Sequence, residues 1–331
     1  MKLDPRKLIR STVLLIILLA PSIWMMWTIP PLWRDVDGYV QLMHPLGCTT
    51  ILDYGPLYCF LARLPLYVGY VIEFLRGVVP PPSRVFLSYP VLTDSGIFAL
   101  LLSQHAALAA SGFYLIASIS RFFWVRLSMS IFWAANPLFY AFAQSVGSEM
   151  LSLILVILLV TTGLRIMQEA RNVPWEELRY FGVLLWLEWL YFGALLCLCL
   201  VTRYGNVVLV ILMPLALGGV WLGHFAKTPF ARSRWSLRRL RLLRRRAWRL
   251  FLAAVATSIA ALLLANISIR VLCNVAHIHY HSRTGHTFVW RLHFLTNLPE
   301  ETRNKLLDEV SANTASPAVR ELLSMIGKAA S

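Results

Sequence analysis

Charged side chains are scarce in this sequence. They make up 14% of its 331 residues, whereas soluble domains carry about 25%. Hydrophobic residues make up 58%, so too few polar side chains remain to cover one soluble core. This scarcity excludes a single soluble domain and predicts an all-α, polytopic membrane bundle.

Cysteine is also sparse, and no CxxC or Cys/His zinc spacing occurs among the five cysteines. Cys48 and Cys59 share one segment and could pair if it faces an oxidising compartment. Cys197, Cys199 and Cys273 lie in or beside apolar runs, where cysteine usually packs. The cysteines therefore predict no metal site.

Acidic residues are outnumbered, with 16 acids against 31 Lys and Arg and a net charge of +15. Nine arginines fall between Arg232 and Arg249 with no acid among them. This pattern is typical of a cytoplasmic loop, placed at about 224–249, that contacts anionic membrane lipids. Nucleic acid is not expected as a partner, because no recognition motif accompanies the arginines.

Long apolar runs predict about seven to eight transmembrane helices, since a helix needs about 20 apolar residues to cross a bilayer. A further run at 57–76 contains Arg63, Pro65, Glu73 and Arg76, which favours an interfacial or re-entrant helix. The expected spans are Ser11–Ile29 and residues 94–119, 125–143, 148–167, 180–198, 204–223 and 250–273.

The charges between the spans predict the orientation. With a cytoplasmic N-terminus and seven spans, Arg121, Arg126, Arg165 and the arginine-rich loop all fall inside. Residues 30–93, 143–147 and 201–206 then fall outside. The bundle is expected over 1–276. Residues 277–331 are expected to be an outer-facing tail of two short amphipathic helices.

The first outer loop, at about 30–93, is long and is therefore expected to be functional. It carries Asp35, Asp37 and Asp53. A carboxylate in an interfacial cleft can act as a general base, and Asp35 and Asp37 together could hold a divalent cation such as Mg²⁺ or Mn²⁺. Two solvated aspartates beside a turn at Gly38 are the alternative.

Two further outer elements are candidates for a site. Glu149 begins a span, where an acid stabilises the helix N-terminus or binds substrate. Arg203 and Tyr204 interrupt a long apolar stretch. Arg203 could bind a lipid phosphate, or it could pair with Glu188 or with an outer acid. Glu188 is a carboxylate within a span, where a charge is costly and usually faces a partner or cavity.

The order of these parts resembles the GT-C superfamily of membrane glycosyltransferases, particularly its polyprenyl-phosphate-sugar-dependent mannosyltransferases. The resemblance covers roughly residues 1–225. It rests on short motifs: Asp35-x-Asp37-Gly-Tyr39, Asp53-Tyr-Gly-Pro-Leu-Tyr58, Gln104, Asn136-Pro, Ser148-Glu149 and Thr202-Arg203.

The resemblance implies a hexosyltransferase that moves a mannose-like sugar from a polyprenyl-phosphate donor, with inversion. The acceptor would be a glycan, lipid or protein on the periplasmic or lumenal face of a bacterial plasma membrane or ER-type membrane. Asp35 or Asp37 would activate the acceptor hydroxyl, and Arg203 would steady the leaving phosphate. Residues implied to line the site are Tyr39, His44, Tyr54, Tyr58, Gln104 and His105.

Family members often have more spans, and many carry a large soluble C-terminal domain. This chain has a tail of only about 55 residues. Two alternative functions therefore remain open. One is a multi-pass transporter or lipid flippase, and the other is a non-catalytic assembly subunit.

Overall fold

The computed structural model describes residues 5–33, 42, 55–82, 91–172, 178–227, 237–275 and 277, and six residues between 301 and 309. The chain forms two compact units, Met1–Ile278 and His279–Ser331. Most of the second unit, with its expected amphipathic helices, lies outside the described residues. Those described there are helical: Glu301, Thr302, Asn304, Lys305, Asp308 and Glu309.

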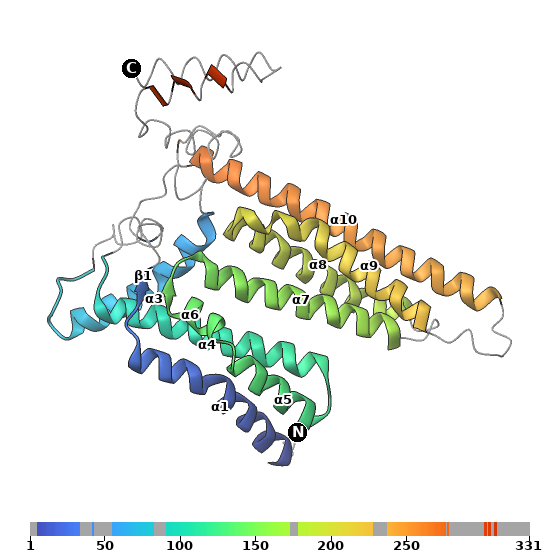
Figure 1. Ribbon diagram of the computed structural model, residues 1–331, viewed down its shortest axis with the longest axis horizontal. Helices are drawn as coiled ribbons and strands as arrows, with labels where there is room; N and C mark the ends of the chain where they lie inside the picture. Colours follow the sequence, from blue (N-terminus) through green and yellow to red (C-terminus); the bar gives the residue numbers. More distant parts are fainter. Residues whose placement is uncertain are drawn as a thin grey trace. The chain divides into compact units, whose positions relative to one another are not determined.

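The first unit is a bundle of long helices that run alongside one another (Figure 1). Its order is α1 (Pro5–Thr28), β1 (Leu32–Trp33), α3 (Pro56–Leu75), α4 (Asp94–Ile119), α5 (Phe123–Ala134), α6 (Pro137–Gln144), β2 (Ser145–Val146), α7 (Ser148–Asn172), α8 (Leu178–Thr202), η3 (Tyr204–Val208), α9 (Leu209–Lys227) and α10 (Leu237–Val275).

Five described helices are long and apolar enough to cross a membrane. They are α1, α3, α4, the Ser148–Glu169 part of α7 and the Phe251–Val275 part of α10. The described parts of α8 and α9 contribute shorter apolar stretches, Leu187–Thr202 and Gly205–Gly219. These helices agree with the predicted all-α membrane bundle. The number of spans stays a prediction.

Helix α7 is shared by the two main hydrophobic cores. On one side Ile154 and Ile157 pack with Leu18 of α1, Leu108 of α4 and Tyr140 of α6. On the other side its residues pack against α8, α9 and α10, in a core that contains Leu159, Ile166, Phe192, Leu196, Met213, Leu217, Ala254 and Ala261. The position of α7 between these groups explains why its span is the most buried of the five.

The expected span 125–143 is wrong as a single helix. Helix α5 ends at Ala134, and α6 starts at Pro137. Proline lacks an N–H and disfavours the helical conformation of the residue before it. Asn136 is accordingly extended and caps α6 by accepting a hydrogen bond from Leu138 N at 3.1 Å.

The helix ends alternate, so one end of the bundle gathers the C-termini of α1 and α8 and the N-termini of α4 and α7. We call it the strand end, because β1 and β2 pair there in parallel, Leu32 with Ser145 and Trp33 with Val146. Figure 1 labels β1 at this end. The opposite end includes the start of α10. The expected loop at 224–249 differs from the structure, which is helical to Lys227 and again from Leu237.

Both ends of α3 contact the strand end. Gly55, with φ of 86°, lies so close to the C-terminus of α8 that an added Cβ would stand 2.6 Å from Thr202 O. At the other end, Glu73 Oε1 accepts a hydrogen bond from Ser95 N of α4 at 2.7 Å. A helix that crossed the bundle would end at opposite faces, so this geometry favours the interfacial placement of α3.

Candidate functional site

Arg203 and Glu149 form an ion pair at the strand end. Their Nη1 and Oε1 atoms lie 3.1 Å apart. The Glu149 side chain is 14% exposed, whereas that of Arg203 is 45% exposed. A guanidinium has five N–H donors in a planar fork, so Arg203 can contact Glu149 and still offer donors to a second anion.

The polar interruption at 202–206 is explained by the way it ends α8. Arg203 N and Asn206 Nδ2 both donate to Cys199 O, at 3.1 and 2.8 Å. Asn206 Nδ2 also donates to Ser152 Oγ of α7 at 2.9 Å. These bonds satisfy a carbonyl of the last turn and tie η3 to α7. Arg203 is extended and stands between α8 and η3.

A buried amide holds the segment that leads to Glu149. Gln104 Nε2 of α4 donates to Ala143 O at 2.9 Å and to Ser145 O at 3.0 Å. Its Oε1 accepts a bond from Tyr58 Oη at 3.4 Å, and Tyr58 Oη accepts one from Gly147 N at 3.1 Å. Helices α3 and α4 thus fix the backbone two residues before Glu149.

The neighbouring His105 holds the same segment from another side. His105 Nε2 lies 2.9 Å from Gln144 Oε1, and Gln144 Nε2 donates to Ile29 O at 2.6 Å. His105 Nδ1 is buried without a hydrogen-bond partner among the described residues. Together these bonds join α4 and α6 to the end of α1.

The structure thus brings together some of the expected site residues. Glu149 and Arg203 meet directly, and Tyr204 begins η3 next to them. Tyr58, Gln104 and His105 are buried and bind backbone or buried side-chain groups near Glu149. The remaining candidates, Asp35, Asp37, Tyr39, His44, Asp53 and Tyr54, lie outside the described residues, as does Cys48.

The described residues that flank 34–54 converge on the ion pair. Before this segment, Trp33 pairs with Val146, three residues from Glu149. After it, Gly55 lies against Thr202, next to Arg203. The segment that carries the three aspartates therefore starts and ends beside Glu149 and Arg203.

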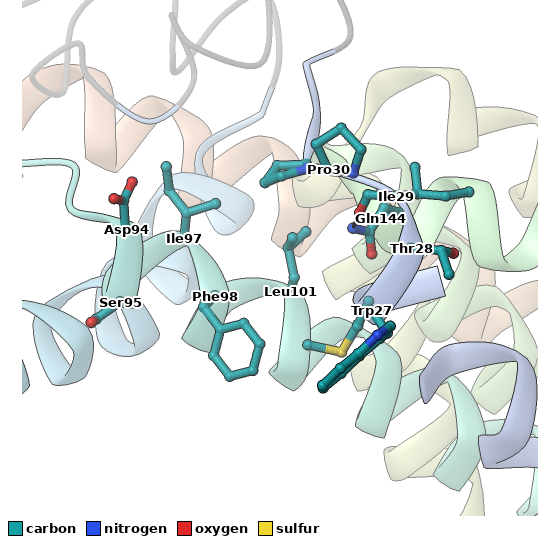
Figure 2. Close-up of a pocket in the computed structure, with 12 residues that line it drawn as sticks. Trp27, Thr28, Ile29, Pro30, Asp94, Ser95, Ile97, Phe98, Leu101 and Gln144 are labelled. Atoms are coloured by element: carbon teal, nitrogen blue, oxygen red, sulfur yellow. Dashed lines mark hydrogen bonds between the residues drawn. The ribbon is translucent and has the colours of Figure 1, made fainter. Parts of the chain in front are cut away.

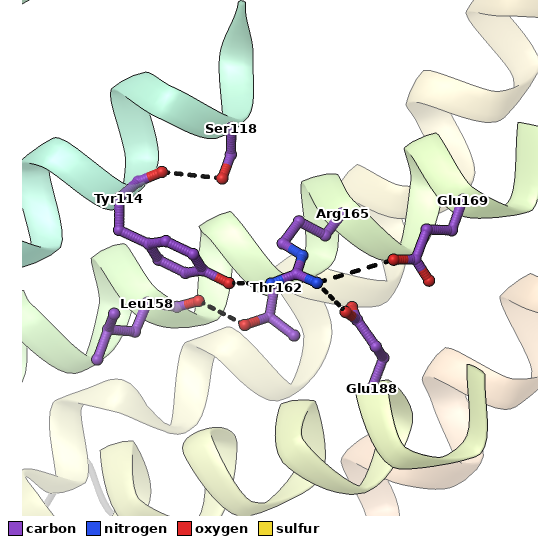
Figure 3. Close-up of polar contacts among 7 residues, drawn as sticks. All are labelled: Tyr114, Ser118, Leu158, Thr162, Arg165, Glu169 and Glu188. Carbon is purple, nitrogen blue, oxygen red and sulfur yellow. Dashed lines mark hydrogen bonds and ion pairs between the residues drawn. The ribbon is translucent and has the colours of Figure 1, made fainter. Parts of the chain in front are cut away.

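Of the two partners considered for Arg203, the structure shows an outer acid, Glu149, and not Glu188. Glu188 Oε1 lies 2.7 Å from Arg165 Nη2 of α7, whereas Arg203 pairs with Glu149. Arg165 also lies 3.8 Å from Glu169 Oε1 and donates to Tyr114 Oη (Figure 3). The sequence marked Glu188 as needing a partner. It did not identify Arg165, because the pairing depends on how α7 and α8 pack.

A pocket of about 530 Å³ opens between the end of α1 and the start of α4, with Gln144 beside Ile29 in its lining (Figure 2). Sequence reasoning missed it, because its walls are separated by more than 60 residues. Its lining residues are Met26, Trp27, Thr28, Ile29, Pro30, Pro31, Asp94, Ser95, Ile97, Phe98, Leu101 and Gln144.

Among the described residues, no group of three or more His, Cys, Asp or Glu side chains could hold a metal ion. Asp35 and Asp37, the expected cation ligands, lie outside the described residues.

No protein-family model matches this chain. No curated protein and no solved structure matches it significantly. The GT-C resemblance therefore stays a prediction.

Proposed function

We propose that this chain is a membrane glycosyltransferase that takes a sugar from a polyprenyl-phosphate donor at the strand end of the bundle. The observation that carries the proposal is the Arg203–Glu149 pair, with its guanidinium partly exposed where the segment bearing Asp35 and Asp37 starts and ends. The proposal thus puts a phosphate-binding cation beside the two points where the segment with the candidate bases starts and ends.

Arg203 is proposed to bind the phosphate of the donor and to stabilise it as it leaves. Guanidinium forms bidentate contacts with phosphate oxygens. Preorganised charge that meets a developing anion is among the largest catalytic effects. Glu149 would hold the guanidinium in place while Arg203 keeps donors for the phosphate.

Asp35 or Asp37 is proposed to take the proton of the acceptor hydroxyl. The hydroxyl oxygen then forms a bond to the anomeric carbon as the bond from that carbon to the phosphate oxygen breaks. The products are an inverted glycoside, polyprenyl phosphate and a protonated aspartate. Mg²⁺ or Mn²⁺ at the aspartates is not required by this scheme.

Separate Asp35→Asn and Asp37→Asn variants test the proposal. Membranes that contain each variant would be given a panel of radiolabelled polyprenyl-phosphate hexoses, and released polyprenyl phosphate and new glycoside would be measured. We expect at least one variant to lose transfer. Wild-type rates in both would reject the aspartates as the base. An absence of transfer by the wild-type chain with every donor would reject the proposal.

Transport is a second candidate, supported by the cluster of charged side chains that Arg165 and Glu169 of α7 form with Glu188 of α8. Ionisable residues within spans often mark ion or substrate paths. Glu169 Oε2 and Glu188 Oε2 are buried and have no hydrogen-bond partner among the described residues. Movement of a lipid or solute across vesicles by the purified protein, lost in Glu188→Gln and without sugar transfer, would favour transport.

A further inference from the structure

The pocket between α1 and α4 combines an apolar wall with a polar rim. Figure 2 shows Asp94 at one side, Thr28 and Ile29 at the other, and Ile97, Phe98 and Leu101 along α4 between them. Its volume of about 530 Å³ lies within the range of small-molecule sites, about 300–1,000 Å³.

The apolar part of the pocket faces outward. Trp27 is 89% exposed and Phe98 is 55% exposed, although both stand on helices apolar enough to cross a membrane. Large apolar side chains exposed on such helices contact lipid, and tryptophan favours the interface between lipid and water. Leu101, only 3% exposed, forms the inner wall. A hydrocarbon chain can therefore enter from the bilayer.

The polar part of the pocket mainly accepts hydrogen bonds, because the N–H groups of Ser95, Gly96 and Ile97 in the first turn of α4 are already paired with Glu73 and Thr93. Asp94 is a carboxylate, and the last carbonyls of α1 around Thr28 point toward this end with the negative end of the helix dipole. Both Gln144 side-chain atoms are already engaged by His105 and Ile29. Such a rim suits hydroxyl donors and disfavours phosphate, in contrast to the cation at Arg203.

The two strands that lead toward the proposed site begin at the pocket. Ile29, Pro30 and Pro31 immediately precede β1, and Gln144 immediately precedes β2. Because β1 and β2 are parallel, both segments of the chain run away from the pocket in the same direction. One continues into the segment that carries Asp35 and Asp37, and the other continues to Glu149.

We infer that this pocket binds the glycosyl acceptor, and that the acceptor is a membrane lipid with a hydroxyl-bearing head. The hydrocarbon chain packs on Trp27, Phe98 and Leu101, and the hydroxyls face Asp94. This inference rests on the proposed function and narrows its acceptor from a glycan, lipid or protein to an amphiphile.

The binding test uses an alkyl glucoside with a diazirine in its chain, photolysed with the full-length protein in nanodiscs. We expect labelling at Leu101, because lipid that only surrounds the protein does not reach this buried position. Leu101→Trp fills the pocket and should reduce labelling of the α1 wall at least about tenfold, equivalent to about 1.4 kcal/mol. Phe132→Trp, at an 82% exposed position on α5, is the matched control and should label as wild type.

A second variant tests the head group without filling the pocket. Asp94→Asn should weaken labelling by the glucoside about tenfold, as loss of a charged hydrogen-bond acceptor does. Labelling by a diazirine alkane without a head group should stay the same. An equal loss of labelling by both probes in Asp94→Asn would overturn the inference. Labelling of the α1 wall that is unchanged in Leu101→Trp would also overturn it.

Transfer measurements separate this inference from the proposed function. We expect the alkyl glucoside to accept sugar at least about tenfold faster than methyl glucoside at equal concentration, a difference of about 1.4 kcal/mol. If sugar is transferred equally to alkyl and methyl glucoside and Leu101 is not labelled, the inference of a lipid acceptor is wrong. The proposed glycosyltransferase activity is then still supported. Label at Leu101 without transfer from any donor overturns both roles, and the pocket is then a lipid site only.

Discussion

Arg203 lies 3.1 Å from Glu149 across the junction of α7 and α8, and it keeps 45% of its side chain exposed. The two residues are 54 positions apart in the chain. Their contact requires the end of α8 and the start of α7 to lie side by side, which the bonds of Asn206 to Ser152 and Cys199 maintain. The packing of the strand end therefore holds the Arg203–Glu149 ion pair in place.

Replacement of Arg203 tests its proposed contact with phosphate. Arg203→Ala should lower the transfer rate by about 100- to 1,000-fold, the usual effect of removing one oxyanion donor. Arg203→Lys should fall between this variant and wild type, because lysine keeps the charge but loses the bidentate fork. Initial rates at saturating donor measure both. Arg121→Ala, an exposed arginine beyond the other end of α4, should leave the rate unchanged, and an equal loss there would contradict the assignment.

Gly147→Ala probes the position of the Glu149 carboxylate. An added Cβ at this residue would collide with Glu149 Oε2. The flexible carboxylate has to move, so we expect transfer to fall about tenfold, or about 1.4 kcal/mol, with little change in melting temperature. Gly205→Ala is the matched control, since nothing lies within 4 Å of its Cβ position. Wild-type transfer by Gly147→Ala would show that this carboxylate position is not needed.

Gln104→Leu tests the buried amide. Leucine fills the space but leaves the carbonyls of Ala143 and Ser145 without their donor, which should cost about 1–3 kcal/mol of unfolding free energy. Equilibrium unfolding in detergent measures the loss. Gln168→Leu removes a similar bond to Ser118 O at an exposed site and should change stability by less than about 0.5 kcal/mol. Equal losses in the two variants would argue against a special role for Gln104.

Arg165 and Glu188 should show coupled effects on stability. Arg165→Met leaves Glu188 inside the bundle without its 2.7 Å partner, and Glu188→Met leaves Arg165 with the more distant Glu169. Arg165→Met should destabilise the protein more than the double change does, because it leaves Glu188, only 14% exposed against 41% for Arg165, as a largely enclosed charge without its partner. Unfolding of all four proteins gives the coupling energy. Additive losses would mean that the pair contributes nothing.

The sequence predicted the elements that depend on local composition. Apolar runs located the long helices, and alternation of the spans placed Glu149 and Arg203 at one end. The break at Asn136-Pro137 had a local signal, but a continuous apolar run around it favoured one span. The partner of Glu188 and the pairing of β1 with β2 had no such signal. Two-residue strands show no periodicity. The Arg165–Glu188 contact joins residues more than 20 positions apart, and the strand pairing joins residues more than 100 positions apart.

The strand pairing also has a consequence for biosynthesis. Leu32 and Trp33 are made 113 residues before their partners Ser145 and Val146, and Gly55 is made 147 residues before Thr202. At about 5–20 residues per second, translation leaves these contacts without partners for about 5–30 s. The proposed site can thus assemble only after α7 and α8 have been inserted. Until then the ends of the segment 34–54 lack the contacts with Val146 and Thr202 that hold them in the finished bundle.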